Sequence, residues 1–170
     1  SRNASIDKTL IEAKKIAQTN VKEVVLTGVN IGDFGQGSDE NFFELIKKLD
    51  KIEGIERFRI SSIEPNLLST EIIEFVCKSD KFVPHFHIPM QSGSDALLTA
   101  MRRKYDKSRY QSRIEKIKDL MPHCSIGVDV IVGFPGETDE IFEETYSFLV
   151  DLPVSYLHVF TYSERANTTA

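Results

Sequence analysis

The chain has 170 residues, of which 41% are hydrophobic and 28% charged, and its formal net charge at pH 7 is −5. This composition is typical of a soluble globular protein and excludes a mainly disordered chain, so we expect residues 1–170 to form a single domain. The apolar stretches are far shorter than the ~20 residues that a membrane span requires, which predicts no membrane contact. The acidic charge argues against a domain that wraps nucleic acid, although nucleic-acid contacts from other parts of a longer protein stay open.

The predicted helices and strands alternate along the chain, as hydrophobic periodicity and capping residues indicate. In chain order they are helix 6–18, strand 23–29, helix 42–52, strand 57–63, helix 70–77, strand 83–90, helices 96–101 and 110–121, strand 125–132, helix 139–149 and strand 155–162. Strict alternation implies parallel strands joined by right-handed crossovers. Five strands are too few for an eight-stranded barrel, so an open doubly wound sheet and an incomplete barrel are both compatible with this pattern. The apolar run 125–132 is typical of a parallel strand covered on both faces.

The ends of the chain and its cysteines indicate a piece of a larger cytoplasmic protein. Ser1 opens the chain without an initiator methionine, and Ala170 closes it just after a predicted strand. Cys77 and Cys124 lie far apart in the sequence, and no signal peptide precedes them. This pattern favours two buried, reduced thiols.

Small polar residues, glycines or carboxamides follow every predicted strand. Ligands of parallel α/β folds collect at the carboxyl ends of the strands, so this pattern favours a ligand-binding edge over ordinary surface turns. The segments concerned are 27–32, 61–65, 91–94, 133–138 and 161–163.

The segment 133–138, Gly-Phe-Pro-Gly-Glu-Thr, carries the sharpest of these signals. Its glycines allow the backbone to approach a flat ligand, and the free amides at the start of the next helix suit an oxygen-rich group. The alternative interpretation is an ordinary strand-to-helix turn, in which Glu137 only complements the helix N-terminus.

Three further features have both a structural and a functional interpretation. Gln91 and Ser92 offer an amide and a hydroxyl to a ribose or an amino acid, or else Ser92 helps to begin the next helix. The basic cluster 101–105 either complements a helix end or supplies an arginine to a carboxylate. Asp129 lies within an apolar strand, where a carboxylate must be paired, so we expect it to have a partner or a site role.

The sequence predicts no metal site. His85 and His87 lie on the same face of a predicted strand, but no Cys, Asp or Glu at ligand spacing accompanies them. We therefore interpret both as core or loop histidines.

Six segments occur in the order typical of one protein family. They are LTGVNIG from Leu26, SSIEP from Ser61, HIPMQSGS from His87, MRRKY from Met101, DVIVGFPGET from Asp129 and YSER from Tyr162. Together they resemble the radical S-adenosylmethionine core of the tRNA methylthiotransferases over essentially the whole chain. The first segment is most similar to the threonylcarbamoyladenosine-tRNA branch. The resemblance implies a partial (βα) barrel of parallel strands, whose first strand and cluster-binding CxxxCxxC loop precede Ser1.

The resemblance also implies an activity for the whole enzyme. That enzyme would insert a methylthio group at C2 of N6-threonylcarbamoyladenosine in tRNA, with S-adenosylmethionine, [4Fe–4S] clusters and an electron donor, in the cytoplasm. Because the cluster cysteines precede Ser1, this chain alone would bind no cluster and be inactive, and its first strand would expose an edge for self-association. The alternatives are the core of another radical enzyme and a non-catalytic α/β ligand-binding module.

Site residues follow from the resemblance, motif by motif. The residues implied to bind the cofactor are Thr27, Gly28, Ser61, Ser62, Glu64, Gln91, Ser92, Arg103, Asp129, Gly133, Phe134, Pro135, Gly136 and Glu137. Tyr162 and Arg165 are implied to face the RNA substrate.

Overall fold

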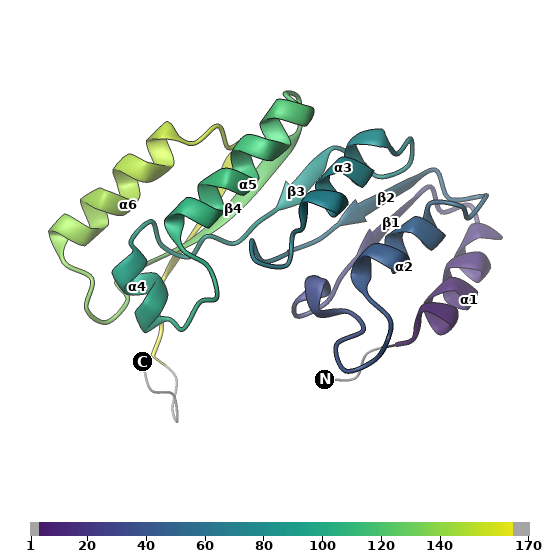
Figure 1. Cartoon of the computed structure of the whole chain (residues 1–170), viewed down its shortest axis with the longest axis horizontal. Coiled ribbons are helices and arrows are strands. Elements are labelled where there is room, and N and C mark those ends of the chain that lie inside the picture. The colour runs from purple at the N-terminus through teal and green to yellow at the C-terminus, as the bar shows by residue number, and fades with distance from the viewer. Residues whose placement is uncertain (1–3, 165–170) are drawn as a thin grey trace.

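The computed structural model describes residues 4–164, and helices and strands alternate in this part of the chain as the sequence predicts (Figure 1). In chain order the elements are α1 (Ile6–Ala17), β1 (Glu23–Leu26), the 3-10 helix η1 (Ile31–Asp33), α2 (Phe42–Leu49), β2 (Arg57–Ile60), α3 (Thr70–Lys78), β3 (His85–His87), α4 (Asp95–Ala100), α5 (Lys107–Leu120), β4 (Ser125–Val132), α6 (Asp139–Asp151) and β5 (Tyr156–Thr161). The bounds of β4 are those predicted. The strand predicted over 83–90 shrinks to β3, since the prolines at both of its ends have no N–H to donate.

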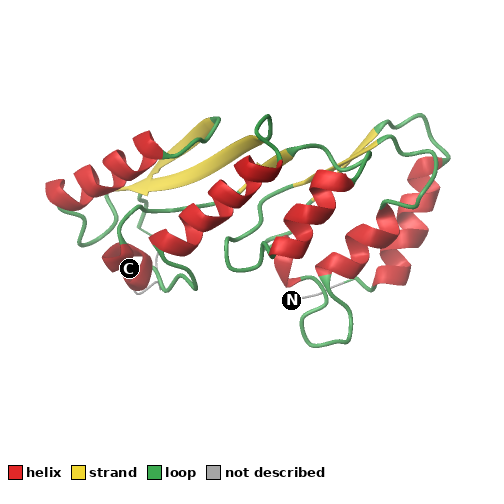
Figure 2. Cartoon of the chain, turned by 45° about the horizontal axis from the view of Figure 1, so that its top comes forward, coloured by secondary structure: helices red, strands yellow, loops and turns green. Residues whose placement is uncertain are grey.

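The five strands form one parallel array in sequence order. β1 pairs with β2, and β3, β4 and β5 form a second set, with every pair parallel. Isolated bridges from Phe58 to Phe82 and from Ser62 to His87 join the two sets. Consecutive parallel crossovers of one hand leave all helices on the same side of the strands, as Figure 2 shows. This arrangement is the incomplete barrel, and it excludes the doubly wound sheet.

The strands bury one face against the helices and turn the other toward the barrel interior. Phe58, Phe86 and Ile126 on neighbouring strands are fully buried in the core. The residues between these core positions point to the opposite face of each strand, the interior face, which is polar along much of its length. In β4 the interior face includes Gly127 and Asp129. The expectation that β4 is covered on both faces is therefore wrong, because helices cover only one.

The two cysteines are free thiols. Cys124 is buried just before β4, and burial raises the pKa of its thiol to about 11. Cys77 is half-buried on α3, with its Sγ 3.5 Å from the carbonyl oxygen of Leu120. The expectation of two buried thiols therefore holds for Cys124 only. Within residues 4–164, none of the helices has the length and apolar character to cross a membrane.

Candidate functional site

Three loops meet at the carboxyl ends of the strands, around the side chain of Glu64. Oε1 of Glu64 accepts a hydrogen bond from Nη1 of Arg103 at 3.3 Å, and the two residues form an ion pair. Oε2 of the same carboxylate lies 3.4 Å from Nδ2 of Asn30, which also donates to Oδ2 of Asp33 at 2.9 Å. These residues follow β1, β2 and α4, so the arrangement exists only in the folded chain.

Several buried polar atoms at this edge have no hydrogen-bond partner within the described residues. They are Oδ1 of Asn30, Oδ1 of Asn66, Nε of Arg103 and Oε1 of Glu137. Buried polar groups in folded proteins are almost always satisfied, so an unpaired set at one edge requires an explanation such as a ligand or bound water. The donors and acceptors are suited to a polar molecule that carries amino, carboxylate or hydroxyl groups.

The turn between β4 and α6 has the open backbone that the sequence predicts. Gly133 and Gly136 have φ of +77° and +92°, the left-handed region that favours glycine. The amide of Gly133 donates to Oε2 of Glu137, which closes the turn. Thr138 then caps α6 by accepting from the amide of Ile141 at 3.4 Å. Neither glycine has a heavy atom within 4 Å of where a Cβ would stand, so the turn has free space beside its backbone.

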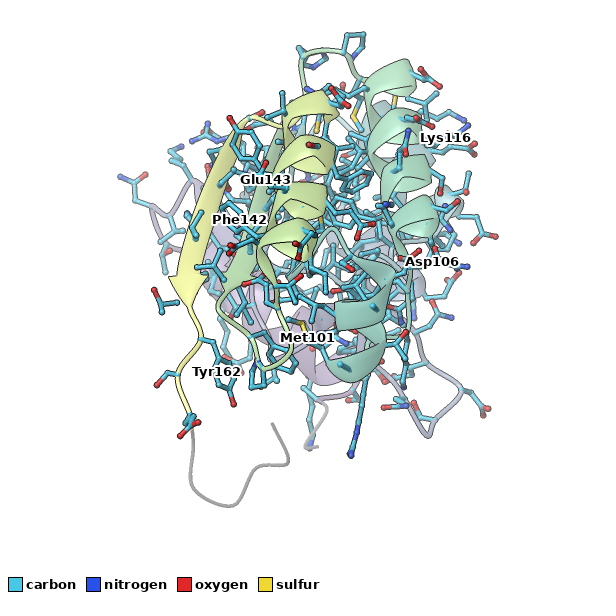
Figure 3. The ribbon with its side chains drawn as sticks, turned by 90° about the vertical axis from the view of Figure 1, so that its left-hand side faces the viewer. Met101, Asp106, Lys116, Phe142, Glu143 and Tyr162 are labelled. Atoms are coloured by element: carbon cyan, nitrogen blue, oxygen red, sulfur yellow. The ribbon has the colours of Figure 1, made fainter. Side chains whose placement is uncertain are left out.

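A small cavity joins this turn to the basic cluster and to the residue after β5. Its volume is about 190 Å³, and Arg103, Phe134 and Tyr162 are among the residues that line it. The rings of Phe134 and Tyr162 meet edge to face with centroids 5.3 Å apart. Figure 3 shows Tyr162 at the same end of the molecule as Met101, which also lines the cavity. Arg165, the other predicted substrate residue, lies outside the described residues.

Two residues beside the cavity and the strand ends adopt backbone conformations that are unusual for residues other than glycine. Gln91 has a φ of +70° and Arg102 a φ of +55°. The amide of Gln91 donates to the carbonyl of Asp129 at 2.8 Å, and its carbonyl accepts from Ile131 at 2.9 Å, so the β4 backbone holds it in this conformation. Strain of this kind concentrates at functional sites.

Ser92 and the glycine after it anchor the loop to α6. Ser92 is fully buried, and its Oγ lies 3.3 Å from Oγ1 of Thr145. The amide of Gly93 donates to the same Thr145 oxygen at 3.1 Å, and a Cβ at Gly93 would stand 2.9 Å from the Thr145 Cα. Ser94 begins α4, but its own side chain makes no capping bond. Oγ of Ser92 also accepts a hydrogen bond from the amide of Ser94 at 3.1 Å, so this hydroxyl holds the loop both against α6 and at the start of α4.

The residues that directly follow β1 and β2 lie at the carboxyl ends of these strands, at the other side of the array from the turn after β4. Thr27 and Gly28 line a cavity of about 710 Å³ between β1, η1 and the start of the chain. The amide of Ser61 donates to the carbonyl of Leu26 at 3.0 Å and continues the β1–β2 pairing. Ser62 is half-buried and bridges toward His87.

Asp129 lies deeper in the barrel than the turn that follows it. It is four residues before Gly133, about 13 Å along an extended strand. Oδ1 of Asp129 contacts Nε2 of His87 at 2.9 Å and Nδ1 of His158 at 3.2 Å. The expectation that Asp129 is paired is confirmed. The sequence interpretation missed its partners, although Asp129 and the histidines are spaced to share the interior face of β3, β4 and β5.

A second group of charges occupies the interior face near the amino ends of the strands. Glu23 bonds Arg57 and Arg59, with its oxygens 3.1 and 2.9 Å from their Nε atoms, and these two bonds lower the pKa of its carboxyl. Burial lowers the pKa of His85, and the charge of Arg59 lowers it further. This group is separate from the loops around Glu64.

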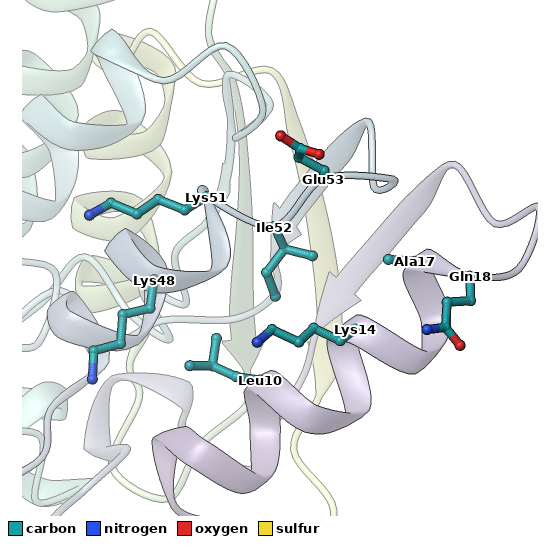
Figure 4. A pocket seen from close by; sticks show the side chains of 8 residues that line it. All are labelled: Leu10, Lys14, Ala17, Gln18, Lys48, Lys51, Ile52 and Glu53. Atoms are coloured by element: carbon teal, nitrogen blue, oxygen red, sulfur yellow. The ribbon is translucent and has the colours of Figure 1, made fainter.

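Another cavity, of about 620 Å³, lies far from the strand ends. It opens between α1 and the end of α2 and is lined by Lys14, Lys48 and Lys51 (Figure 4). Since α1 and α2 run antiparallel to the strands, their carboxyl ends lie beside the amino ends of β1 and β2. This cavity therefore lies at the end of the fold opposite the candidate site.

Comparison with known proteins gives a family match over most of the chain. The sequence profile of the Radical SAM superfamily matches residues 1–149. The chain is 44% identical to the threonylcarbamoyladenosine tRNA methylthiotransferase MtaB of Bacillus subtilis, over 99% of the chain and 38% of that protein. It is 38% identical to the tRNA-2-methylthio-N(6)-dimethylallyladenosine synthase of Alkaliphilus oremlandii, over 99% of the chain and 36% of that protein. The chain thus spans less than half of the length of these relatives.

Solved structures show the same fold at low sequence identity. The radical S-adenosylmethionine methyltransferase TsrM of Kitasatospora setae superimposes with a TM-score of 0.73 at 12% identity, over 92% of this chain and 31% of that chain. Coproporphyrinogen III oxidase of Escherichia coli gives a TM-score of 0.68 at 14% identity, over 94% of this chain and 38% of that chain. These likenesses support the incomplete barrel.

Proposed function

Because this chain belongs to the Radical SAM superfamily, we propose that it is the central part of the catalytic core of a tRNA methylthiotransferase. The proposed reaction of the whole enzyme is insertion of a methylthio group at C2 of N6-threonylcarbamoyladenosine in tRNA. The observation that carries this proposal is the 44% identity to the Bacillus subtilis enzyme over 99% of the chain. The dimethylallyladenosine-type reaction is the second candidate, supported by the 38% identity to the Alkaliphilus enzyme.

The residues at the strand ends fit S-adenosylmethionine, which together with an iron–sulfur cluster supplies the radical chemistry. Glu64 and Asn30 offer oxygen atoms to an amino group, and the unpaired Nε of Arg103 offers a hydrogen bond to a carboxylate. The open backbone at Gly133 and Gly136 leaves room for a flat ring. The role proposed for these loops is to hold the cofactor in one orientation and to exclude water.

The cysteines of the described residues do not fit an iron–sulfur cluster. Such clusters are held by three or four cysteine thiolates, whereas the sequence has two cysteines, and burial raises the pKa of one of them, Cys124. We therefore assign the cluster to residues outside this chain.

The proposed partners follow from the proposed reaction. The whole enzyme would take tRNA as substrate and receive electrons from a donor protein or small reductant, in the cytoplasm. Tyr162, beside the cavity at the strand ends, and Arg165 are the residues of this chain that we assign to the RNA side. The single-domain assignment of residues 1–170 belongs to the same proposal, with further domains of the enzyme outside the chain.

The test compares the 170-residue chain with an extended core that adds the upstream segment of the parent protein. After anaerobic reconstitution, we expect the chain alone to bind no tetranuclear cluster and to bind S-adenosylmethionine no better than high micromolar, about −5 kcal/mol or weaker. The extended core should bind the cluster and, once reduced, form 5′-deoxyadenosine without RNA. Iron and sulfide analysis, calorimetry and chromatography of the nucleoside measure these results.

Two outcomes would contradict the proposal. A stoichiometric cluster on the 170-residue chain would show that the cluster ligands have been misplaced. An extended core that holds its cluster and forms no 5′-deoxyadenosine would overturn the assignment of the chain to a catalytic core. With the complete enzyme, methylthiolation of tRNA that lacks N6-threonylcarbamoyladenosine but carries dimethylallyladenosine would select the second candidate.

We also predict that the 170-residue chain self-associates through β1. Within the described residues β1 is an edge strand, and Val25 on it is 47% exposed. Unpaired backbone groups along such an edge invite pairing with another chain. Sedimentation velocity should show association that rises with concentration and that Val25→Lys weakens. Val159→Lys on β5, the other edge strand, is the matched control. If only Val159→Lys weakens association, the chains pair through β5 and the prediction is wrong.

A further inference from the structure

Three neighbouring strands bring two histidines and an aspartate together on the interior face. Nε2 of His87 on β3 and Nδ1 of His158 on β5 lie 2.9 and 3.2 Å from the same oxygen, Oδ1 of Asp129 on β4. One ligand atom from each residue lies within 4.8 Å of the other two. This triad is the candidate metal-ligand cluster among residues 4–164.

The parallel register of the strands fixes the triad. Asp129 stands directly beside His158, and His87 stands beside Gly127, two residues before Asp129. Gly127 has no side chain to fill the interior here, and a Cβ at this position would fall on the ring of Tyr156. Nε2 of His85 lies 2.9 Å from Oη of Tyr156. The Tyr156 ring therefore bounds the triad on the side of the strand amino ends.

Aromatic rings also flank the histidines directly. The centroid of the His158 ring lies 5.2 Å from that of Tyr156, and the centroid of Phe160 lies 6.4 Å away on the other side. The side chains of His87 and Asp129 are only 16% and 21% exposed, whereas that of His158 is 51% exposed. His87 and Asp129 are thus mostly buried, and His158 is the member of the triad most accessible to solvent.

We propose that His87, Asp129 and His158 form a binding site for a divalent first-row transition-metal ion such as Zn²⁺. Two imidazole nitrogens and one carboxylate oxygen are a common ligand set for such ions, with solvent or a ligand at the remaining positions. Ligand atoms on a tetrahedral zinc ion lie about 3.4 Å apart, so small side-chain rotations suffice to form the site. Each neutral imidazole presents its lone pair once its proton moves to the other ring nitrogen.

This site is distinct from the loops around Glu64 and from the cysteine-bound clusters proposed for the whole enzyme. The triad lies on the interior face of the strands, with Asp129 four residues before the turn at Gly133, and it contains no sulfur ligand. An ion there would tie β3, β4 and β5 together in the barrel interior. The proposal does not depend on the proposed methylthiotransferase activity.

The test is titration of the metal-free 170-residue chain with Zn²⁺ and, in a separate sample, Co²⁺. We expect one ion per chain with micromolar affinity or tighter, a higher Tm in the presence of zinc, and visible cobalt bands of a site with nitrogen and oxygen ligands. Absence of a sulfur-to-cobalt charge-transfer band separates the site from Cys77 and Cys124. Failure to bind either ion at millimolar concentration would overturn the proposal and leave a hydrogen-bonded triad.

Three variants locate the ion. His158→Asn, on the half-exposed ligand, and Asp129→Asn, which keeps the side-chain size, should each weaken zinc binding at least about tenfold. His123→Asn, on an exposed histidine before β4, is the matched control and should bind zinc as the unaltered chain does. Circular dichroism establishes that the variants keep the fold. Equal affinity in all three variants would place the ion elsewhere and contradict the proposal.

Discussion

Gly136→Val in the extended core is expected to lower the rate of 5′-deoxyadenosine formation at least about tenfold, with the cluster content unchanged. Gly136 has a φ of +92°, a conformation in which a β-branched residue costs about 1–3 kcal/mol. The turn can relieve that strain only by moving its backbone. We propose that this backbone borders the cofactor, and displacement of a positioning group by about 1 Å can cost about a hundredfold in rate. Single-turnover assays with reconstituted, reduced protein measure the effect.

Gly37→Val is the matched control for this prediction. Gly37 has a φ of +86°, and like Gly136 it has no heavy atom within 4 Å of where a Cβ would stand. The substitution therefore imposes the same backbone strain in the loop between η1 and α2, without touching the turn after β4. We expect it to lower stability by a similar amount and to leave the rate within about twofold of the parent core. Equal rates for the two variants would show that the turn at Gly136 does not position the cofactor.

Glu64→Gln in the extended core is expected to weaken S-adenosylmethionine binding by about ten- to a hundredfold, since hydrogen bonds to a charged group contribute about 1.5–3 kcal/mol. The substitution removes the charge that faces Arg103 and that we propose meets the amino group of the cofactor. The side chains of Glu64 and Arg103 are 27% and 29% exposed, so loss of their ion pair should change stability much less than it changes binding. Calorimetry and thermal unfolding of the same samples separate the two effects.

Glu23→Gln provides the comparison for Glu64→Gln. Glu23 also pairs with arginines on the barrel interior, but at the amino ends of β1 and β2. Hydrogen bonds from Arg59 and Arg57 lower the pKa of the Glu23 carboxyl in the folded protein. The stability that this carboxylate contributes is therefore fully present above its pKa in the unfolded chain, and it is lost as the pH falls through its pKa in the folded protein. We expect the variant to reduce stability near neutral pH slightly and to leave cofactor binding unchanged. If both variants weaken binding equally, Glu64 acts on the barrel as a whole and does not contact the cofactor.

The fold was predictable because its signals are local. Ser69 and Thr138 cap the helices that were predicted to begin at residues 70 and 139, and β4 begins and ends as predicted. The alternation of elements also established that the strands are parallel. The alternation alone left a doubly wound sheet and an incomplete barrel open, because no single segment encodes the strand order. The family resemblance predicted the incomplete barrel, and the structure confirms it. The strand order also explains why β4 is covered on one face only.

The candidate site was predictable in part. The open glycine turn at 133–138 was predicted, and Gly133 and Gly136 have positive φ there. The hydrogen bond that the amide of Gly133 donates to Glu137 was not predicted. The triad of His87, Asp129 and His158 was not predicted, because its members are far apart in the sequence and only the β3–β4–β5 register aligns them. The signal that would have found the interior face is a set of polar residues two or four positions apart: His85 and His87 in β3, Ser125 and Asp129 in β4, and Tyr156 and His158 in β5. The burial of Ser92 against Thr145 was likewise not predicted, because the partner lies on α6, far along the chain.

The sequence order of the strands has a consequence for how the protein is made. Each strand pairs with the one synthesised just before it, so the array can grow one unit at a time as the chain leaves the ribosome. No strand has to wait for a distant partner, and none has to be threaded between two others. At every stage, however, the last strand formed offers a free edge to any chain nearby until the next unit covers it. Slow translation through a crossover helix would prolong the exposure of this edge. Nascent chains therefore most need chaperone protection while the helix between two strands is being synthesised.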